Sequence, residues 1–249
     1  MEMGKSLLFG TSVSLYKERA KKIRDFLLQN EKIDVNAGDL FFNPFHAVCS
    51  YWAENTDDVQ EFLKKGVAKI NFPGHLNRYP IHMIVSVAHL DKLKMFVDAG
   101  ALLDVVDSDD NTPLHEAMLP SSCRFRRRID ERIRVAAYLI NQGASTTAQN
   151  NIGDTALHIA CKHMFHSNTL NPNDVHISDL HLEIACFIVK CSDDSLSIKN
   201  HEEKTPLEAM GEILLKTKHN GRGNFSIDFD MMNFAIDSIV EHISPTLLK

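Results

Sequence analysis

The sequence predicts an all-α solenoid of about five helix-pair units, with capping helices at both ends. Three observations predict this fold class. The hexad Thr-Pro-Leu-His-Glu-Ala at 112–117 recurs in degenerate form along the chain, apolar runs that end in a small-residue turn follow it, and amphipathic polar segments flank the array. Units of this kind bury their apolar faces only against their neighbours. One continuous stack is therefore a simpler reading than separate domains.

Four degenerate copies accompany the central hexad, at Asn43-Pro44-Phe45-His46, Tyr79-Pro80-Ile81-His82, Thr155-Ala156-Leu157-His158 and Thr205-Pro206-Leu207-Glu208. Measured at the second hexad position, the spacings are 36, 33, 43 and 50 residues. One spacing equals the 33-residue period of ankyrin repeats, and the others exceed it. The chain therefore resembles the ankyrin repeat family. The resemblance implies a noncatalytic protein-protein interaction module that binds a cytosolic protein partner through a concave groove.

Residues 14–29 place apolar side chains at helical spacing, which predicts an N-terminal capping helix. In each unit the hexad Thr caps the first helix and Pro takes its first position, although Asn43 and Tyr79 replace Thr in units 1 and 2. Second helices are expected at 59–63, 89–99, 133–142, 182–191 and 228–243. Gly100 and Gly143 lie where a left-handed helix stop is needed.

These elements give one domain over residues 1–249. Its parts are an N-terminal cap at 12–37, unit 1 at 38–71, unit 2 at 72–106, unit 3 with an insertion at 107–149, unit 4 with an insertion at 150–199, and unit 5 with the C-terminal cap at 200–249. The two long spacings place the insertions, at 119–132 and 162–181, as loops or extensions between paired helices.

The insertion of unit 3 holds a basic cluster in an otherwise acidic chain. Arginine forks suit carboxylate or phosphate, so the cluster is a candidate contact for an anion or an acidic partner. The residues of this contact are Arg124, Arg126, Arg127 and Arg128. The alternative is a solvated helix start whose arginines pair with nearby acids.

The insertion of unit 4 is rich in histidine, with His163, His166, His176 and His181 following His158 and Cys161. Imidazole and thiolate are zinc ligands, but the spacing matches no recognised zinc pattern, so we expect no metal and no cofactor. In the resembling family the hexad imidazole bonds between neighbouring turns. Cys49 and Cys161 stand where the repeat has alanine, which favours packing over nucleophilic catalysis. The alternative is a repeat scaffold with a catalytic or metal site in the insertions of units 3 and 4. We expect no enzyme.

The resemblance also implies which residues meet a partner, because turn tips and exposed first-helix positions line the groove. Transferred position by position, the expected partner-binding residues are Leu40, Phe42, Tyr51, Leu76, Arg78, Val87, Asp109, Asn111, Leu119, Ile152, Asp154 and Lys162. Apolar members concentrate in units 1 and 2, where we expect the hot spot. The alternative is that Phe41, Phe42 and Trp52 fold under the capping helix.

Composition bounds the partners and the compartment. The chain has 27 basic and 33 acidic side chains, a formal charge of −6, which disfavours nucleic acid. The apolar run at 7–9 is too short for a signal peptide or a membrane span, and five cysteines fit reduced thiols, so we expect a cytoplasmic monomer. Uneven, diverged repeats resemble the ankyrin-repeat effectors that intracellular bacteria secrete into the host cytosol.

Overall fold

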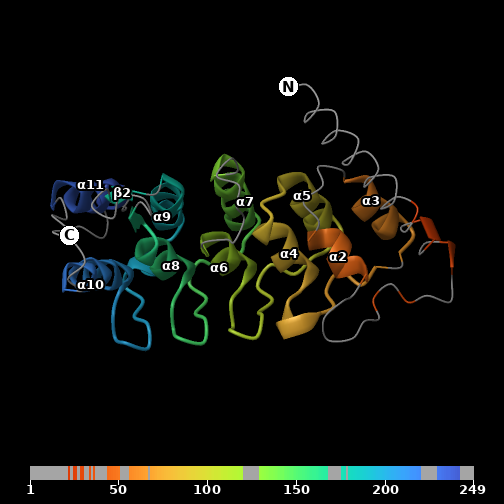
Figure 1. The fold of residues 1–249 in the computed structure, drawn as a ribbon, viewed down its shortest axis with the longest axis horizontal. Helices are drawn as coiled ribbons and strands as arrows, with labels where there is room; N and C mark the ends of the chain where they lie inside the picture. Colours follow the sequence, from red (N-terminus) through yellow and green to blue (C-terminus); the bar gives the residue numbers. More distant parts are fainter. Residues whose placement is uncertain are drawn as a thin grey trace, which may run out of the picture.

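The protein is a stack of helix pairs arranged in two layers (Figure 1). The computed structural model describes residues 22, 25–26, 29–30, 34, 36, 44–50, 56–66, 68–119, 129–167, 175–177, 179–219 and 229–241. First helices form one layer: α2 (Pro44–Ser50), α4 (Pro80–Ser86), α6 (Pro113–Met118), α8 (Ala156–Lys162) and α10 (Pro206–His219). Second helices form the other: α3 (Asp57–Lys64), α5 (Leu90–Asp98), α7 (Ile129–Asn141), α9 (Asp179–Cys191) and α11 (Phe229–Val240). The prediction of an all-α ankyrin-type solenoid is confirmed. The unit boundaries stay a prediction, and units are numbered below by these helix pairs.

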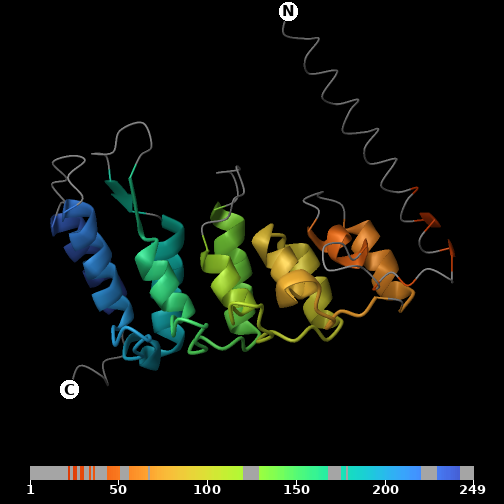
Figure 2. The same cartoon turned by 60° about the horizontal axis from the view of Figure 1, so that its bottom comes forward.

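The segments that join one pair to the next all lie at one end of the helices (Figure 2). We call this surface the turn edge and define it as residues 65–79, 99–112, 142–155 and 192–205. It includes two short 3-10 helices, η1 (His75–Asn77) and η3 (Asp193–Leu196). The first helix of each pair ends, and the second begins, at the opposite end of the stack, which we call the insertion end (Figure 2).

The helices begin and end where the sequence places caps. Thr112 and Thr155 each accept the backbone N–H of the histidine three residues on, and Pro113 occupies the first turn of α6. Gly100 and Gly143 follow second helices with φ of 88° and 93°, a left-handed conformation that glycine adopts without a Cβ penalty. The predicted caps and stops are confirmed at these positions.

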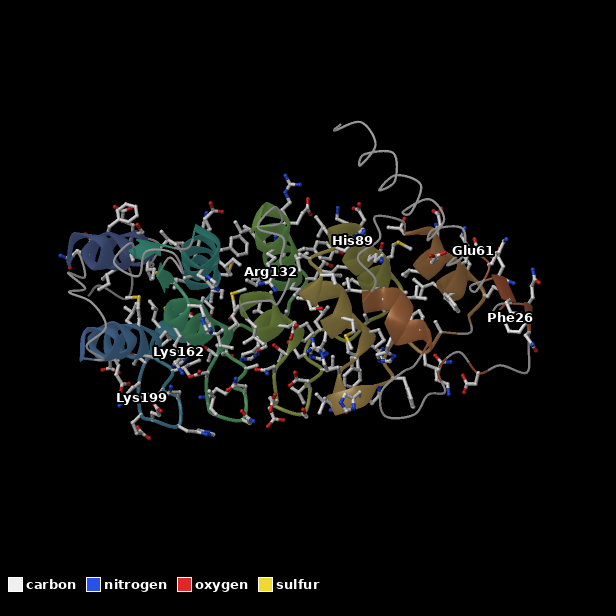
Figure 3. The ribbon with its side chains drawn as sticks, viewed as in Figure 1. Phe26, Glu61, His89, Arg132, Lys162 and Lys199 are labelled. Atoms are coloured by element: carbon white, nitrogen blue, oxygen red, sulfur yellow. The ribbon has the colours of Figure 1, made fainter. Side chains whose placement is uncertain are left out.

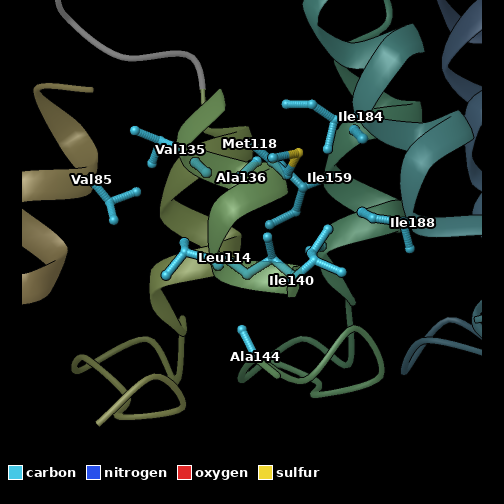
Figure 4. Packing of buried hydrophobic residues seen from close by; sticks show 14 of the residues in the cluster. Val85, Leu114, Met118, Val135, Ala136, Ile140, Ala144, Ile159, Ile184 and Ile188 are labelled. Carbon is cyan, nitrogen blue, oxygen red and sulfur yellow. The ribbon is translucent and has the colours of Figure 1, made fainter. Parts of the chain in front are cut away.

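The apolar core runs along the whole stack between the two layers. Figure 4 shows side chains of α6 and α7, such as Met118 and Val135, lying between those of α4 and α9. Leu114, Met118 and Leu139 are fully buried, and burial of such a side chain stabilises the fold by roughly 1.5–3 kcal/mol. Cys49 and Cys161 belong to the same core, so the packing reading of both cysteines is confirmed.

The insertion of unit 4 is not all loop. It contains strands β1 (Phe165–Ser167) and β2 (Val175–Ile177), paired antiparallel with His166 opposite His176. This hairpin stands at the insertion end (Figure 2). In unit 3, α7 begins at Ile129, inside the predicted insertion, whereas Arg124, Arg126, Arg127 and Arg128 lie outside the described residues.

Most of the predicted N-terminal capping helix also lies outside the described residues. Within the described part of the chain, no helix has the length and apolar character that a membrane crossing requires.

Candidate functional site

The turn edge is one continuous surface because backbone hydrogen bonds join each tip to the next. The N–H of Ser108 donates to Leu76 O over 2.8 Å, that of Asn151 to Asp109 O over 3.0 Å, and that of His201 to Ile152 O over 3.1 Å. The donors stand five residues before the second hexad position and the acceptors four residues before it. The tips of units 2 to 5 are therefore held in register.

An Asp or Asn side chain builds each of the last three tips. The Asn150 side-chain oxygen accepts the backbone N–H groups of Ile152 and Asp154, at 3.2 and 3.0 Å. Asp107 and Asn200 do the same in their own units. This local bonding is why Asp and Asn favour turns. Sequence reasoning missed these residues, although Asp or Asn six residues before the second hexad position is a visible signal.

The same amides tie neighbouring tips together. Nδ2 of Asn150 donates to Oδ1 of Asn111 over 3.0 Å, and Nδ2 of Asn200 donates to Oδ1 of Asp154 over 2.8 Å. Asn111 and Asp154 are consequently buried. The prediction that these two side chains face a partner is corrected, because their polar atoms are used inside the stack.

The hexad histidines link each unit to the following one. In unit 3, Nδ1 of His115 accepts the Thr112 N–H over 3.1 Å, so the proton is on Nε2, which donates to Asp154 O over 3.0 Å. His82 and His158 make the same pair of bonds. Burial lowers the pKa of all three imidazoles, which keeps them neutral. The inter-unit role expected for His158 is confirmed.

Two basic side chains that were predicted to bind a partner form ion pairs with acidic side chains. Nη2 of Arg78 lies 2.8 Å from Oε1 of Glu116, and Nζ of Lys162 lies 2.5 Å from Oδ2 of Asp154. Burial raises the pKa of Glu116, an effect that Arg78 partly offsets. Arg78 and Lys162, both predicted to bind a partner, are therefore engaged with acids of the stack itself.

Large exposed apolar side chains gather on the turn edge. Leu76 and Ile152, both predicted as contacts, are 55% and 52% exposed, whereas Phe72 and Leu102, at 44% and 57%, were missed. Asp109 is exposed as well. Figure 3 shows the side chains of this edge beneath the first-helix layer, with Lys199 among them.

The remaining predicted contacts are less available. Val87 and Leu119 are half-buried, and Leu119 O accepts a bond of 2.8 Å from the guanidinium of Arg132. Leu40, Phe42 and Tyr51 lie outside the described residues, as do Phe41 and Trp52 of the alternative reading.

Leu76 also has an uncommon backbone conformation. Its φ is 54° and its ψ 34°, and the following Asn77 has a φ of 54°. A bulky residue in the left-handed region is a conformational outlier and costs about 1–2 kcal/mol. The side chain does not recover this cost by packing, because more than half of it is exposed.

The cysteine and histidine pairs offer no activated nucleophile. Burial raises the pKa of Cys161 to about 12 and raises that of Cys49 as well, so both remain thiols at neutral pH. His181 lies within α9, and its Nε2 donates to Met118 O over 3.0 Å. Among the described residues, no group of three or more His, Cys, Asp or Glu side chains is arranged to hold a metal ion.

A hollow of about 390 Å³ lies on the second-helix layer, between α7, α9 and α11. Its lining is mainly apolar and includes Ile133, Leu182 and Phe187. It is a second surface to consider, away from the turn edge.

The chain is similar to an ankyrin repeat-containing protein of Schizosaccharomyces pombe, with 30% identity over 131 residues. The match covers 49% of this chain and 56% of the relative, so the chain spans about half the length of the curated relative it matches. No protein-family model matches the chain. The similarity supports an ankyrin repeat family, in agreement with the fold, and with it a protein-interaction module in general.

Proposed function

We propose that the chain is a noncatalytic module that binds a protein partner along its turn edge. The sequence-based expectation was a concave groove formed by turn tips and first helices together. Because the first-helix contact Lys162 is engaged in an ion pair, and Val87 and Leu119 are half-buried, the proposal places the main contact on the tips.

One observation carries the proposal. Of the large apolar side chains exposed among the described residues, Phe72, Leu76, Leu102 and Ile152 all belong to segments between helix pairs, and two, Phe26 and Phe234, lie elsewhere. Exposed apolar side chains grouped on one surface are typical of protein interfaces. Contact with a partner would remove these side chains from water.

The catalytic alternative has weaker support. It needs a thiol beside a free imidazole in the His and Cys cluster of unit 4, but both nitrogens of His158 are hydrogen-bonded and the pKa of Cys161 is raised to about 12. Reactive cysteines have a lowered pKa and partial exposure. The neighbouring His166 and His176 belong to paired strands.

The arginine cluster remains a candidate second contact. In the sequence it lies between the end of α6 and the start of α7, outside the described residues.

The test compares the intact chain with the double variant Leu76→Asn with Ile152→Ser in affinity capture from cytosolic lysate. Asparagine tolerates the left-handed region, so the variant should unfold at the same urea concentration as the intact chain or a slightly higher one. The matched control is Phe234→Ser, which removes an exposed apolar side chain from α11, outside the turn edge.

We expect a protein that the intact chain and the control retain and that the double variant loses by about tenfold or more, since one interface anchor is worth at least about 1–2 kcal/mol. Equal capture by all three would contradict the proposal. That result would move the contact to the insertion end or to the hollow between α7, α9 and α11.

Action as a bacterial effector in a host cytosol is a narrower proposal. It is supported by the uneven hexad spacing, and the fission-yeast relative adds nothing to it. A translocation reporter fused to the chain and expressed in an intracellular bacterium tests it. Reporter signal in the host cytosol is expected, and signal confined to the bacterium would contradict the proposal.

A further inference from the structure

We infer that the partner presents a segment with an apolar anchor followed by basic side chains, laid along the turn edge. This inference rests on the proposed function and gives the chemical class of the partner. It is argued from how apolar and acidic side chains are divided among the tips.

At one end, the turn edge of units 2 and 3 presents exposed apolar side chains, with Nζ of Lys69 lying 5.4 Å from the centroid of the Phe72 ring. Asn71 joins two turns there, because its Nδ2 donates to Gly100 O and its Oδ1 accepts the Leu102 N–H, both over 3.0 Å. These bonds hold Phe72 and Leu102 on adjacent turns. Leu76, whose carbonyl accepts the Ser108 N–H, is the third exposed apolar side chain of this part of the edge. This part of the edge suits an aromatic or aliphatic anchor.

The tips of units 3 and 5 are acidic. Each ends in two adjacent carboxylates, Asp109 with Asp110 and Glu202 with Glu203, and all four residues are exposed. In unit 5, Lys204 is shared between Glu202 and Glu212.

One exposed lysine lies near the acidic tip of unit 5. Nζ of Lys199 is 3.8 Å from Glu203, a long ion pair that contributes little in water. The tips therefore keep a surplus of negative charge, which attracts a basic partner and repels an acidic one.

Ile152 separates the two acidic tips. Because the backbone hydrogen bonds hold the tips in register, a segment lying along the edge meets the apolar end, the acids of unit 3, Ile152 and the acids of unit 5, in that order. The complementary segment has an apolar anchor, then Lys or Arg, then a second apolar side chain, then Lys or Arg. An acidic peptide or a nucleic acid backbone does not match this order of charges.

The test uses a random dodecapeptide phage library panned against three purified chains. They are the intact chain, the edge variant and a matched control. The edge variant carries Asp109→Asn, Asp110→Asn, Glu202→Gln and Glu203→Gln, and the control carries Asp91→Asn, Asp98→Asn, Glu183→Gln and Glu241→Gln. Both variants lose four exposed carboxylates, but the control loses them outside the tips.

We expect the intact chain and the control to enrich peptides that combine Lys or Arg with an aromatic or aliphatic residue. The edge variant should keep the apolar preference and lose the basic one. A synthetic peptide of the enriched sequence, measured by fluorescence anisotropy, should bind the edge variant about tenfold more weakly, because four exposed charge contacts are removed. Its affinity for the intact chain should fall as NaCl is raised.

Enrichment of acidic or neutral peptides, with equal affinity for the edge variant, would overturn this inference and leave the proposed function standing. Failure of the intact chain to enrich any peptide over a blank surface would count against the proposed function itself, and the inference would fall with it.

Discussion

The tips of units 2 and 4 reach the same hairpin-like turn by different means. In unit 4, Asn150 organises the tip, Gly153 takes the left-handed position with a φ of 78°, and the Thr155 side chain caps α8. In unit 2, Gly74 stands in place of the organising Asn, and two residues, Leu76 and Asn77, have positive φ.

The difference shows that the tip of unit 2 is less well stabilised than that of unit 4. A Cβ on Gly74 would lie 3.0 Å from the ring of His46, so the imidazole of the preceding unit takes the space that an Asn side chain would need. The tip of unit 2 therefore lacks the Asn side chain that organises the tip of unit 4. This same tip presents Leu76, the exposed side chain on which the proposed function rests.

The largest effect is expected for Gly153→Ala. A Cβ there would lie 2.5 Å from the backbone N of His201, and the φ of 78° disfavours any side chain. Together these costs should lower the free energy of unfolding by about 3 kcal/mol. Urea titration followed by circular dichroism measures the loss. In the matched control, Gly100→Ala, φ is also positive but no atom lies within 4 Å, so a loss of about 1 kcal/mol is expected. Equal losses would contradict the clash.

His115→Phe breaks an inter-unit link and should cost about 2 kcal/mol. It leaves the buried N–H of Thr112 unpaired and removes one of the two hydrogen bonds that the Asp154 carbonyl accepts, the other coming from the Asn150 N–H. In unit 5, Glu208 replaces the histidine and bonds the Thr205 N–H within its own unit over 2.8 Å. Glu208→Ala should therefore cost less, about 0.5–1 kcal/mol. The midpoints of urea unfolding compare the two variants. A larger loss from the exposed Glu208 would refute the inter-unit account.

The free energy of unfolding should decrease as the pH is lowered below about 6.5. Burial lowers the pKa of His46, His82, His115 and His158 from 6.5, so the unfolded chain binds these protons more readily than the folded chain does. The stability from each neutral imidazole is present above the unfolded pKa and is lost as pH falls from 6.5 towards the folded pKa, by at most about 1.4 kcal/mol per pH unit. Urea midpoints at pH 7.5, 6.5 and 5.5 measure the slope.

The double variant His115→Phe with His158→Phe should reduce that slope. A slope that is flat, or unchanged in the double variant, would contradict the assignment to the hexad histidines. The raised pKa of Glu116 acts in the opposite direction, because its stabilising contribution is lost as pH rises from 4.5 towards the folded pKa. Glu116 therefore reduces the slope of stability against pH only at the acid end of the pH range.

The smallest effect is a gain. Glu203 has a φ of 59° at the position that Gly153 occupies in unit 4, so Glu203→Gly should relieve backbone strain and raise the free energy of unfolding by about 0.5–1 kcal/mol. The neighbouring Glu202 is not in the left-handed region, so Glu202→Gly should be neutral or destabilising. Thermal unfolding of both variants tests the difference, and an equal shift would show that backbone strain is not the cause.

Local caps in the sequence predicted much of the fold. Thr112, Pro113 and Gly100 act through bonds and backbone angles within a few residues, so their roles could be inferred without knowing what lies opposite. The pairing of His166 with His176 could not, because the strands are short and the insertion was predicted to be a loop or a helix extension.

The candidate site was predicted less well for a related reason. Phe72 and Leu102 belong to apolar patterns that are typical of a core, and only the arrangement of neighbouring turns decides that they are exposed. Conversely, Asn111 and Asp154 are polar tip residues, which sequence position alone assigns to the surface. Amides from the following unit, of Asn150 and Asn200, bury them.

The inter-unit hydrogen bonds of the hexad histidines all run in the same direction along the chain. Every imidazole belongs to one unit and its acceptor carbonyl to the next unit along the chain, as with His158 and Lys204. When the C-terminal one of two neighbouring units detaches, the histidine at the start of the remaining unit's first helix loses its acceptor carbonyl. Within the histidine links, detaching the N-terminal one of the two exposes a carbonyl, such as that of Arg78, although a backbone N–H of the next tip, such as that of Ser108, also loses its acceptor. The histidine links therefore make unfolding from the two ends unequal. Unfolding should begin more easily at the last helix pair than at the first.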